Sequence, residues 1–485
     1  MWSINRHRVA FLIWAAVVAY ASLLSCQPPQ TATTQNGQSN SGGGGRTPQT
    51  ISIAVVKGDE TSAKNYYKET FDALGLPADI ASIAKGEPGM SALLTYLGYP
   101  DLQPPDLENT PSSELIKNFG DDLLASAFFA PKITDVSVKG PNDINVGWRK
   151  VIRLRARSNS AAAQHGIAAG FLLFNKFQGK NHSLDPFAPR GDKSNESKTT
   201  QLILVRTEKG TGADPLQRPI HFFVFGPASE GAKLKLALQA SFDAAAPEIE
   251  AGLPSLINNY FVPLACAQCH GGLKLNEATG DLNVVVFERQ KLNFLDTDHW
   301  FDRVQDGDDF AFLRAENKFG VLFDGGTNET SAQFAKAFDV LRGLNDEIKK
   351  QNERAEPDPA KPSFQFRAVQ RWLEVHPAGD NTHKDLFARA LPPLPGAGPA
   401  WSRAAEPDKQ LLPLMNRFCY RCHSSIIYSL FDRPEVACRK VKIKNFLNLP
   451  PGNPRAMPQD RVLDPVIKTT LQDLAAKLPD TKCSN

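Results

Sequence analysis

The chain contains two copies of a five-residue pattern in which a histidine directly follows the second of two cysteines. The copies are Cys266-Ala267-Gln268-Cys269-His270 and Cys419-Tyr420-Arg421-Cys422-His423. Two thiols at this spacing can form thioethers with the two vinyl groups of one porphyrin, and the adjacent imidazole can ligate its iron. We therefore predict that each copy binds a haem c (Fe) covalently, with His270 and His423 as the proximal ligands.

Two other uses of cysteine fit this arrangement less well. Structural zinc sites usually bring their ligand pairs within roughly 12 to 20 residues of each other, whereas these copies lie far apart and each has its own histidine. A thioredoxin-like Cys-x-x-Cys motif needs one copy only and gives no reason for the histidine. Haem attachment is the preferred interpretation.

The amino terminus has the features of an export signal. Arg6 and Arg8 precede an apolar segment at residues 10–24. This segment is shorter than the ~20 apolar residues that a helix needs to cross a bilayer, so a cleaved signal peptide at residues 1–25 is favoured over an uncleaved anchor. Export also leads to the compartment in which bacteria attach haem c.

Residues 23–26, Leu-Leu-Ser-Cys, resemble the lipobox of bacterial lipoproteins. The resemblance implies cleavage before Cys26 and lipidation of its thiol. Because Gln27 follows instead of Asp, it also implies anchoring in the outer membrane, facing the periplasm. The residues up to position 49 are rich in Gln, Thr, Ser, Asn, Pro and Gly, a composition that stays a flexible coil. We expect residues 26–49 to be a lipidated tether.

Charge and composition limit the partners. The formal net charge of +3 falls to +1 when residues 1–25 are removed, because Arg6 and Arg8 leave and no acidic residue does. A chain so close to neutral, with scattered basic residues and no nucleic-acid motif, gives no reason to expect a nucleic-acid partner. We expect redox partner proteins and, through the lipid, a membrane.

The remaining sequence is expected to form an α+β N-terminal domain followed by two mainly α-helical cytochrome c-like modules. The predicted boundaries are 50–250 for the α+β domain, 251–400 for the first haem module and 401–485 for the second. Within the first of these, periodicity predicts helices at 60–74, 91–97 and 113–127 and strands at 200–207, 219–226 and 233–242. The role of this domain is left open.

The C-terminal segment resembles a class I cytochrome c. Residues 411–418 are apolar at helical spacing before Cys419, and residues 464–478 form an amphipathic final helix. Between them lies Met457, which is followed by a proline. In the family, a methionine at this place is the distal ligand of the iron, and a His/Met pair raises the reduction potential. Met457 is therefore the expected distal ligand of haem 2, with core filling as the alternative.

Two further cysteines, Cys438 and Cys483, remain after the haem motifs and Cys26 are assigned. In an oxidising compartment they are expected to form a disulfide. The bridge would enclose Met457 and stabilise by up to ~4 kcal/mol in the chain-entropy model. A buried thiol at either position is the alternative.

The distal ligand of haem 1 stays open. No methionine lies between His270 and Met415, and His299 is the nearest imidazole downstream. His299 is the first choice, an open coordination position the second, and His376 or His383 the third. The acidic run 296–309 suits Ca2+ as an alternative to a solvated turn, although it does not match an EF-hand loop.

These motifs together predict a dihaem c-type cytochrome that carries electrons between periplasmic or outer-membrane partners. The number and spacing of the motifs also resemble those of bacterial dihaem cytochrome c peroxidases. That more distant similarity implies an alternative function, in which haem 1 is a reactive site and haem 2 an electron reservoir.

Overall fold

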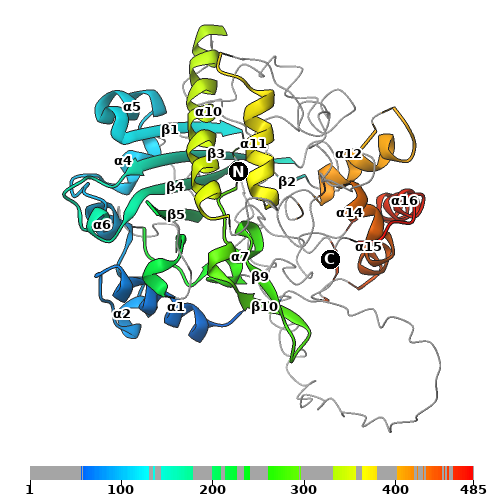
Figure 1. Cartoon of the computed structure of the whole chain (residues 1–485), viewed down its shortest axis with the longest axis horizontal. Helices are drawn as coiled ribbons and strands as arrows, with labels where there is room; N and C mark the ends of the chain where they lie inside the picture. Colours follow the sequence, from blue (N-terminus) through cyan, green and yellow to red (C-terminus); the bar gives the residue numbers. More distant parts are fainter. Residues whose placement is uncertain are drawn as a thin grey trace, which may run out of the picture. The chain divides into compact units, whose positions relative to one another are not determined.

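Figure 1 shows the computed structural model of the chain. The structure describes residues 56, 58–129, 135–136, 144–178, 199–208, 214–226, 234–240, 260–293, 295, 331–356, 363–379, 401–402, 404–419, 423, 430, 433–450, 453, 456–457 and 463–483. All of them belong to one unit, residues 52–485.

A group of short helices precedes the sheet. These helices are α1 (Glu60–Ala73), α2 (Ile80–Ala84), α3 (Met90–Tyr96), α4 (Pro104–Asn109) and α5 (Ser112–Phe119). Asp59 begins α1, because its carboxylate accepts a hydrogen bond from the Ser62 N–H at 2.8 Å, which satisfies a donor that the first turn leaves unpaired. The predicted helices at 60–74 and 91–97 are confirmed within one residue at each end.

An antiparallel sheet forms the centre of the described chain. Its strands are β1 (Leu123–Phe129), β2 (Asp135–Val136), β3 (Ile144–Arg155), β4 (Ile167–Gln178), β5 (Thr199–Arg206) and β6 (Ile220–Phe225). The order is β1-β3-β4-β5-β6, with β2 paired to β3. The turn η1 (Gly120–Asp122) leads from α5 into β1, the short helix α6 (Ala161–Gln164) lies between β3 and β4, and the turn η3 (Pro215–Gln217) lies between β5 and β6. The predicted strands at 200–207 and 219–226 are confirmed as β5 and β6.

Both faces of this sheet are covered. Directly opposed residues of an antiparallel sheet point to the same face, and the register gives one row of Leu124, Arg153, Phe171, Ile203 and Phe222. Helix α10 packs on this face. The Leu124 side chain of β1 lies against Gly343 of α10, where a Cβ atom would be 3.8 Å from the Leu124 Cδ1. The opposite face carries Phe223, whose ring lies 5.3 Å from that of Phe71 on α1.

Two tyrosines of α1 satisfy the backbone at the edge strand β6. The Tyr66 hydroxyl accepts from the Phe222 N–H at 2.9 Å and donates to the Phe222 carbonyl at 3.3 Å. The Tyr67 hydroxyl accepts from the Val224 N–H at 3.2 Å and donates to the Ala237 carbonyl at 2.9 Å. An edge strand otherwise presents unpaired backbone groups, so α1 closes this edge together with residues 235–237, which bond to Val224 and Gly226.

The elements after the sheet hold the first cysteine motif. They are β7 (Gln239–Ala240), β8 (Tyr260–Phe261), α7 (Leu264–His270), β9 (Leu273–Asn276), β10 (Asp281–Val285) and η4 (Phe287–Arg289). Strands β7 and β8 pair with each other, as do β9 and β10. Two longer helices follow, α10 (Ser331–Arg354) and α11 (Phe364–Val375), which run side by side in Figure 1.

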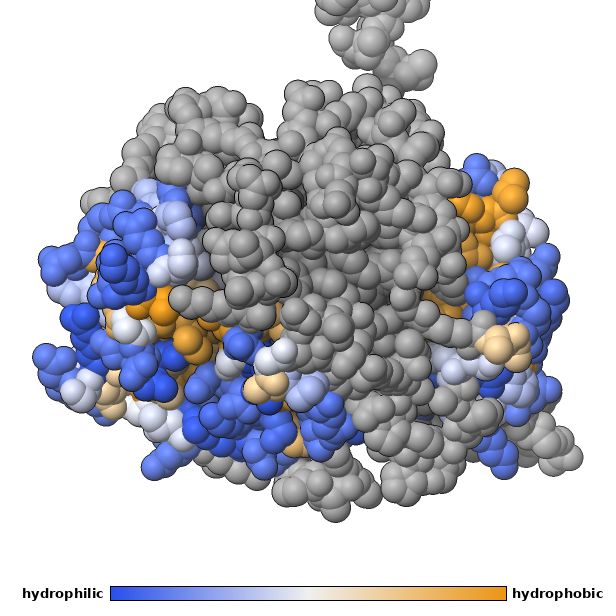
Figure 2. Space-filling model, turned by 90° about the horizontal axis from the view of Figure 1, so that it is seen from above, coloured by the Kyte–Doolittle hydropathy of each residue, from blue (hydrophilic) through white to orange (hydrophobic). Residues whose placement is uncertain are grey.

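The C-terminal elements are helical. They are α12 (Asp408–Phe418), α14 (Arg433–Cys438), α15 (Lys440–Leu447) and α16 (Pro465–Ala476). Helices α12 and α16 match the apolar patterns expected at 411–418 and 464–478. Where Figure 2 is coloured, the surface is mostly hydrophilic. Among the described residues, no helix combines the length and the apolar character that crossing a bilayer requires.

The predicted fold class, an α+β domain followed by two mainly α-helical cytochrome c-like modules, is wrong. The first motif lies on the seven-residue helix α7, between two small strand pairs, and its histidine packs on the sheet through Phe222. A helix of this length is too short to build a core of its own, and it packs instead on β7–β10 and on Phe222 of the sheet. There is no separate helical module around α7 in the described residues.

The sheet is also larger than predicted. The expected helix at 113–127 ends at Phe119, and its second half is strand β1. Strand β3 was not predicted, because two buried charged residues break the alternation of polar and apolar residues. Lys150 and Arg153 are 0% and 2% exposed. The Lys150 ammonium donates to the carbonyls of Glu108, at 3.0 Å, and Thr110, which compensates part of its desolvation. The strand predicted at 233–242 is not continuous in the described residues 234–240. Leu236 forms an isolated bridge with Phe225, and β7 covers only Gln239–Ala240.

Candidate haem-attachment site

The first motif forms the end of a helix. The α7 backbone includes Cys266, Cys269 and His270, and residues four apart lie on one helix face. The side chains of Cys266 and His270 are 7% and 8% exposed. Gly271 ends the helix at φ +80°, a left-handed conformation that favours glycine. The helix therefore places Cys266 and His270 on one face, with both residues largely buried.

The His270 ring is fixed by the peptide that follows the hairpin β9–β10. Its Nδ1 lies 2.8 Å from the Lys291 carbonyl oxygen, and the Lys291 N–H donates to the His270 carbonyl at 2.8 Å. The ring also packs against Phe222, with centroids 4.8 Å apart. A carbonyl partner assigns the proton to Nδ1 and the lone pair to Nε2. Metal-binding histidines have this arrangement, since the second nitrogen usually donates to a carbonyl or carboxylate. The residues at this site fit the iron of a haem.

The segment that carries Lys291 is attached to α10. We call the described residues 291–293 and 295 the strap. Asn352 donates to the Leu292 carbonyl and accepts from the Leu292 N–H, both at 2.8 Å. Asn345 makes the same pair of bonds to Leu295, both at 2.7 Å. Each carboxamide thus satisfies both backbone groups of one strap residue, as a neighbouring strand would.

The Lys291 side chain makes a third attachment. Its ammonium is buried, with 1% of the residue exposed, and it donates to the Ala355 carbonyl at 2.8 Å. Ala355 directly follows the last residue of α10. The carbonyls at a helix C-terminus carry partial negative charge, so a cation there is stabilised. Lys291, Asn345 and Asn352 belong to no motif that can be recognised in the sequence. The only local signal is the seven-residue spacing of the asparagines, which places both on one helix face.

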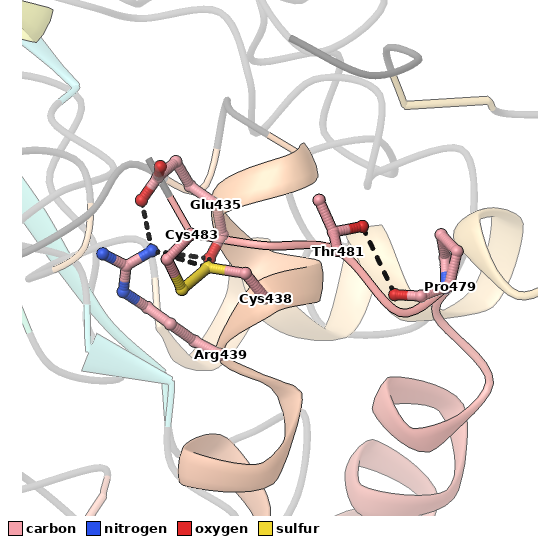
Figure 3. The surroundings of a disulfide bond; sticks show 6 residues. All are labelled: Glu435, Cys438, Arg439, Pro479, Thr481 and Cys483. Carbon is pink, nitrogen blue, oxygen red and sulfur yellow. Dashed lines mark hydrogen bonds and ion pairs between the residues drawn. A yellow bond between two sulfur atoms is a disulfide. The ribbon is translucent and has the colours of Figure 1, made fainter. Parts of the chain in front are cut away.

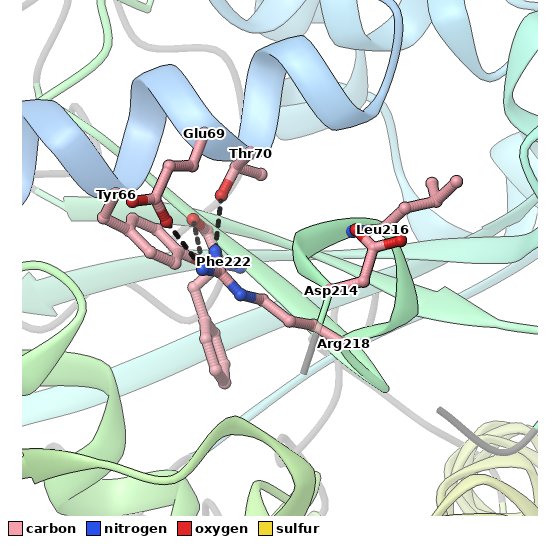
Figure 4. A network of polar contacts seen from close by, with 7 residues as sticks. All are labelled: Tyr66, Glu69, Thr70, Asp214, Leu216, Arg218 and Phe222. Carbon is pink, nitrogen blue, oxygen red and sulfur yellow. Dashed lines mark hydrogen bonds and ion pairs between the residues drawn. The ribbon is translucent and has the colours of Figure 1, made fainter. Parts of the chain in front are cut away.

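A second buried cation, Arg218, contacts helix α1 (Figure 4). The Arg218 guanidinium donates to the Thr70 hydroxyl at 3.1 Å and to the Glu69 carboxylate at 2.9 Å. It also lies over the Phe287 ring at 3.9 Å and over the Tyr66 ring at 5.2 Å. The Arg218 side chain is 6% exposed and that of Glu69 is 55% exposed. Arg218 therefore connects α1 to the turn η4, which leads into the strap.

The thiol of Cys266 lies close to the tyrosines that close the sheet edge. Burial raises the pKa of Tyr66, Arg218 opposes the increase, and Cys266 adds to it. Burial also raises the pKa of Tyr67, again with a contribution from Cys266. Both hydroxyls therefore stay protonated and keep donating to their carbonyl partners.

His221 lies on the other side of the sheet. It precedes Phe222 in β6, and adjacent strand residues point to opposite faces, so His221 faces away from His270. The side chain is fully buried and neither ring nitrogen has a hydrogen-bond partner. Burial, together with the charges of Arg218 and Arg206, lowers the pKa of His221 to about 3. It is a neutral core residue.

The second motif begins at the end of α12, and residues 420–422, including Cys422, lie outside the described residues. Cys419 is partly buried and His423 is 8% exposed. The His423 N–H donates to the Cys419 carbonyl at 2.9 Å, which is a helical bond. The His423 carbonyl accepts from the Leu430 N–H at 2.9 Å, and Trp401 donates its indole N–H to the Leu430 carbonyl at 2.7 Å. Trp401 and Leu430 therefore hold the backbone at His423.

The structure brings Cys438 and Cys483 together in a disulfide (Figure 3), with an S–S distance of 2.00 Å. The bridge links the end of α14 to the segment after α16. Met457, between them in sequence, is partly buried, and its N–H donates to the carbonyl of Phe446 in α15 at 3.1 Å. These contacts place Met457 next to the end of α15; its role as a ligand stays a prediction.

The other predicted residues divide into two groups. Cys26, His299, His383 and the acidic run 296–309 lie outside the described residues. His376 is described: it is buried at the end of α11, with its ring 4.5 Å from that of Trp372 and 5.2 Å from that of Phe338. Within the described ranges, no group of three or more His, Cys, Asp and Glu side chains has the geometry to hold a metal ion.

Comparison of the chain with protein-family models, with curated proteins and with solved structures gives no match. The class of protein therefore depends on the two motifs and on the contacts around them.

Proposed function

We propose that this protein is an exported dihaem c-type cytochrome that carries electrons between redox partner proteins. One observation supports this most directly. The first Cys-x-x-Cys-His motif lies in a helix, and the Nδ1 of its histidine is bonded to the Lys291 carbonyl, which is the arrangement of a metal-binding imidazole. A second motif of the same type is present at Cys419, Cys422 and His423.

In this proposal the bound haem supplies one-electron oxidation and reduction at its iron. The protein supplies attachment, orientation and exclusion of water. Cys266 and Cys269 anchor haem 1, and Cys419 and Cys422 anchor haem 2. His270 would hold the iron through Nε2, because the Lys291 carbonyl makes Nδ1 the donor, and its burial would keep solvent away from the ligand.

Met457 is the proposed distal ligand of haem 2. Its segment lies between the two half-cystines of the disulfide and is attached to α15 through the Phe446 carbonyl. A thioether ligand favours ferrous iron and raises the potential. Met457→Ala should therefore lower the potential of haem 2 and remove its sulfur-to-iron charge-transfer band. Met415→Leu, at a buried methionine of α12, is the control and should change neither property. An unchanged band in the Met457 variant would contradict the assignment.

The proposed location follows from the amino terminus. Lipidation at Cys26 would place the protein at the periplasmic side of the outer membrane, and residues 26–49 would act as a tether. Labelling with a radioactive fatty acid tests this step: wild type should be labelled and Cys26→Ala should not. Equal labelling of both would exclude Cys26 as the lipid site.

Mass spectrometry tests the main proposal. Protein exported from a host that carries the haem c attachment machinery should have the mass of the chain plus two haems after denaturation. The double variants Cys266→Ala/Cys269→Ala and Cys419→Ala/Cys422→Ala should each carry one. A wild-type mass without any haem would refute the proposal.

A further inference from the structure

We infer that Asn352 on α10 is a positioning residue that tunes the iron ligand His270 through a single peptide group of the strap. The inference rests on the proposed function, because it concerns the haem that His270 would ligate. It assigns a role to a side chain far from the motif in sequence.

The link between the two side chains is the peptide bond from Lys291 to Leu292. Its carbonyl accepts the His270 Nδ1–H at 2.8 Å. Its N–H donates to the Asn352 carboxamide oxygen, also at 2.8 Å. The peptide group is planar and rigid, so whatever fixes its N–H side also fixes the direction of its carbonyl. The order of contacts is therefore Asn352, peptide, His270.

The strap follows α10 in register. Asn345 and Asn352 are seven residues apart, about 10.5 Å along a helix at 1.5 Å per residue. Leu292 and Leu295 are three residues apart, at most about 10 to 11 Å in an extended chain. A strap of this length can therefore reach both asparagines, as the hydrogen bonds show. Asn345 and Asn352 are both 0% exposed, which keeps water from competing for the same backbone groups.

A hydrogen-bonded N–H polarises its own peptide and makes the carbonyl a stronger acceptor. A stronger acceptor draws the Nδ1 proton and makes the imidazole a better donor to iron. Better donation favours the ferric state and lowers the potential of haem 1. Loss of the Asn352 bond should act in the opposite direction.

Two substitutions separate tuning from simple structural damage. Asn352→Leu removes both bonds to Leu292. Asn352→Asp keeps an oxygen that accepts from the Leu292 N–H, and when ionised it loses the donor to the Leu292 carbonyl. Both variants weaken the attachment of the strap, but only the first removes polarisation of the peptide. The control is Gln351→Leu: Gln351 is a neighbouring buried carboxamide of α10, 3% exposed, that donates to the Pro219 carbonyl at 3.4 Å instead of to the strap.

The experiment is a spectroelectrochemical titration in the Cys419→Ala/Cys422→Ala background, which leaves haem 1 alone. The potential of haem 1 should become more positive in Asn352→Leu, stay at or below the wild-type value in Asn352→Asp, and stay unchanged in Gln351→Leu. If Asn352→Leu is not recovered in folded form, the Asp variant decides. A positive shift in Asn352→Asp, or equal potentials in Asn352→Leu and Gln351→Leu, would overturn the inference while leaving the proposed function intact. Absence of haem from the wild-type protein would instead reject the proposed function.

Discussion

The closure of the β6 edge by α1 predicts a large effect for the loss of one oxygen atom. Tyr67→Phe keeps the ring, which is fully buried, and deletes the hydroxyl that accepts from the Val224 N–H and donates to the Ala237 carbonyl. Val224 is 1% exposed, so its N–H loses its partner without gaining water. Ala237 is partly exposed, and water can replace the hydroxyl there.

The magnitude follows from this difference in burial. A buried donor left without a partner costs about 1–3 kcal/mol, and a hydrogen bond that water can replace costs about 0.5–1.5 kcal/mol. We therefore expect Tyr67→Phe to lower the free energy of unfolding by about 2–3 kcal/mol, mainly through Val224. Equilibrium urea unfolding followed by tryptophan fluorescence measures this loss as a lower midpoint with an unchanged slope.

Tyr99→Phe is the matched control. Tyr99 is also buried, at 2% exposure, and its hydroxyl donates to the Arg155 carbonyl at 2.8 Å. Arg155 is exposed, so the control should cost about 1 kcal/mol or less. Equal losses for the two variants would refute the reasoning, because they would mean that water reaches the β6 edge.

Two further predictions concern pH and the disulfide. The pKa of His221 is lowered to about 3 in the folded protein, so between that pH and about 6.5 the unfolded chain binds a proton that the folded one does not. The free energy of unfolding should therefore decrease with falling pH in this window, by up to about 1.4 kcal/mol per pH unit. In His221→Leu, the urea midpoint should decline less between pH 7 and pH 4 than in the wild type. Equal declines in the two proteins would show that His221 does not cause the pH dependence. Replacing both Cys438 and Cys483 by Ser opens a loop with a sequence separation of 45 residues and should destabilise by up to about 4 kcal/mol in the chain-entropy model. Limited proteolysis after residue 430 should be faster in this variant than in the wild type. Equal cleavage rates in the two proteins would show that the disulfide does not restrict local unfolding of this segment.

Local patterns in the sequence were sufficient for several elements. Helix α1 was predicted from its helical pattern alone, and β5 and β6 because they are apolar segments rich in β-branched and aromatic residues between turn residues. Strand β3 was missed because Lys150 and Arg153 interrupt the alternation. Both side chains can be buried because they donate hydrogen bonds to backbone carbonyls of other segments. Those carbonyls lie more than 30 residues away in the sequence, so a local sequence pattern cannot reveal them.

The sequence by itself determined the chemistry that each motif can perform, because attachment through two thiols and ligation by the next histidine depend on residues that are neighbours in the chain. The pairing of Cys438 with Cys483 was likewise inferred from the number of cysteines and the compartment. Only the tertiary structure decided what surrounds the first motif. Asn352 bonds to Leu292, 60 residues away in the sequence, and Phe222 of the sheet packs directly on His270. Such contacts depend on how separate elements pack, and packing depends on the whole chain.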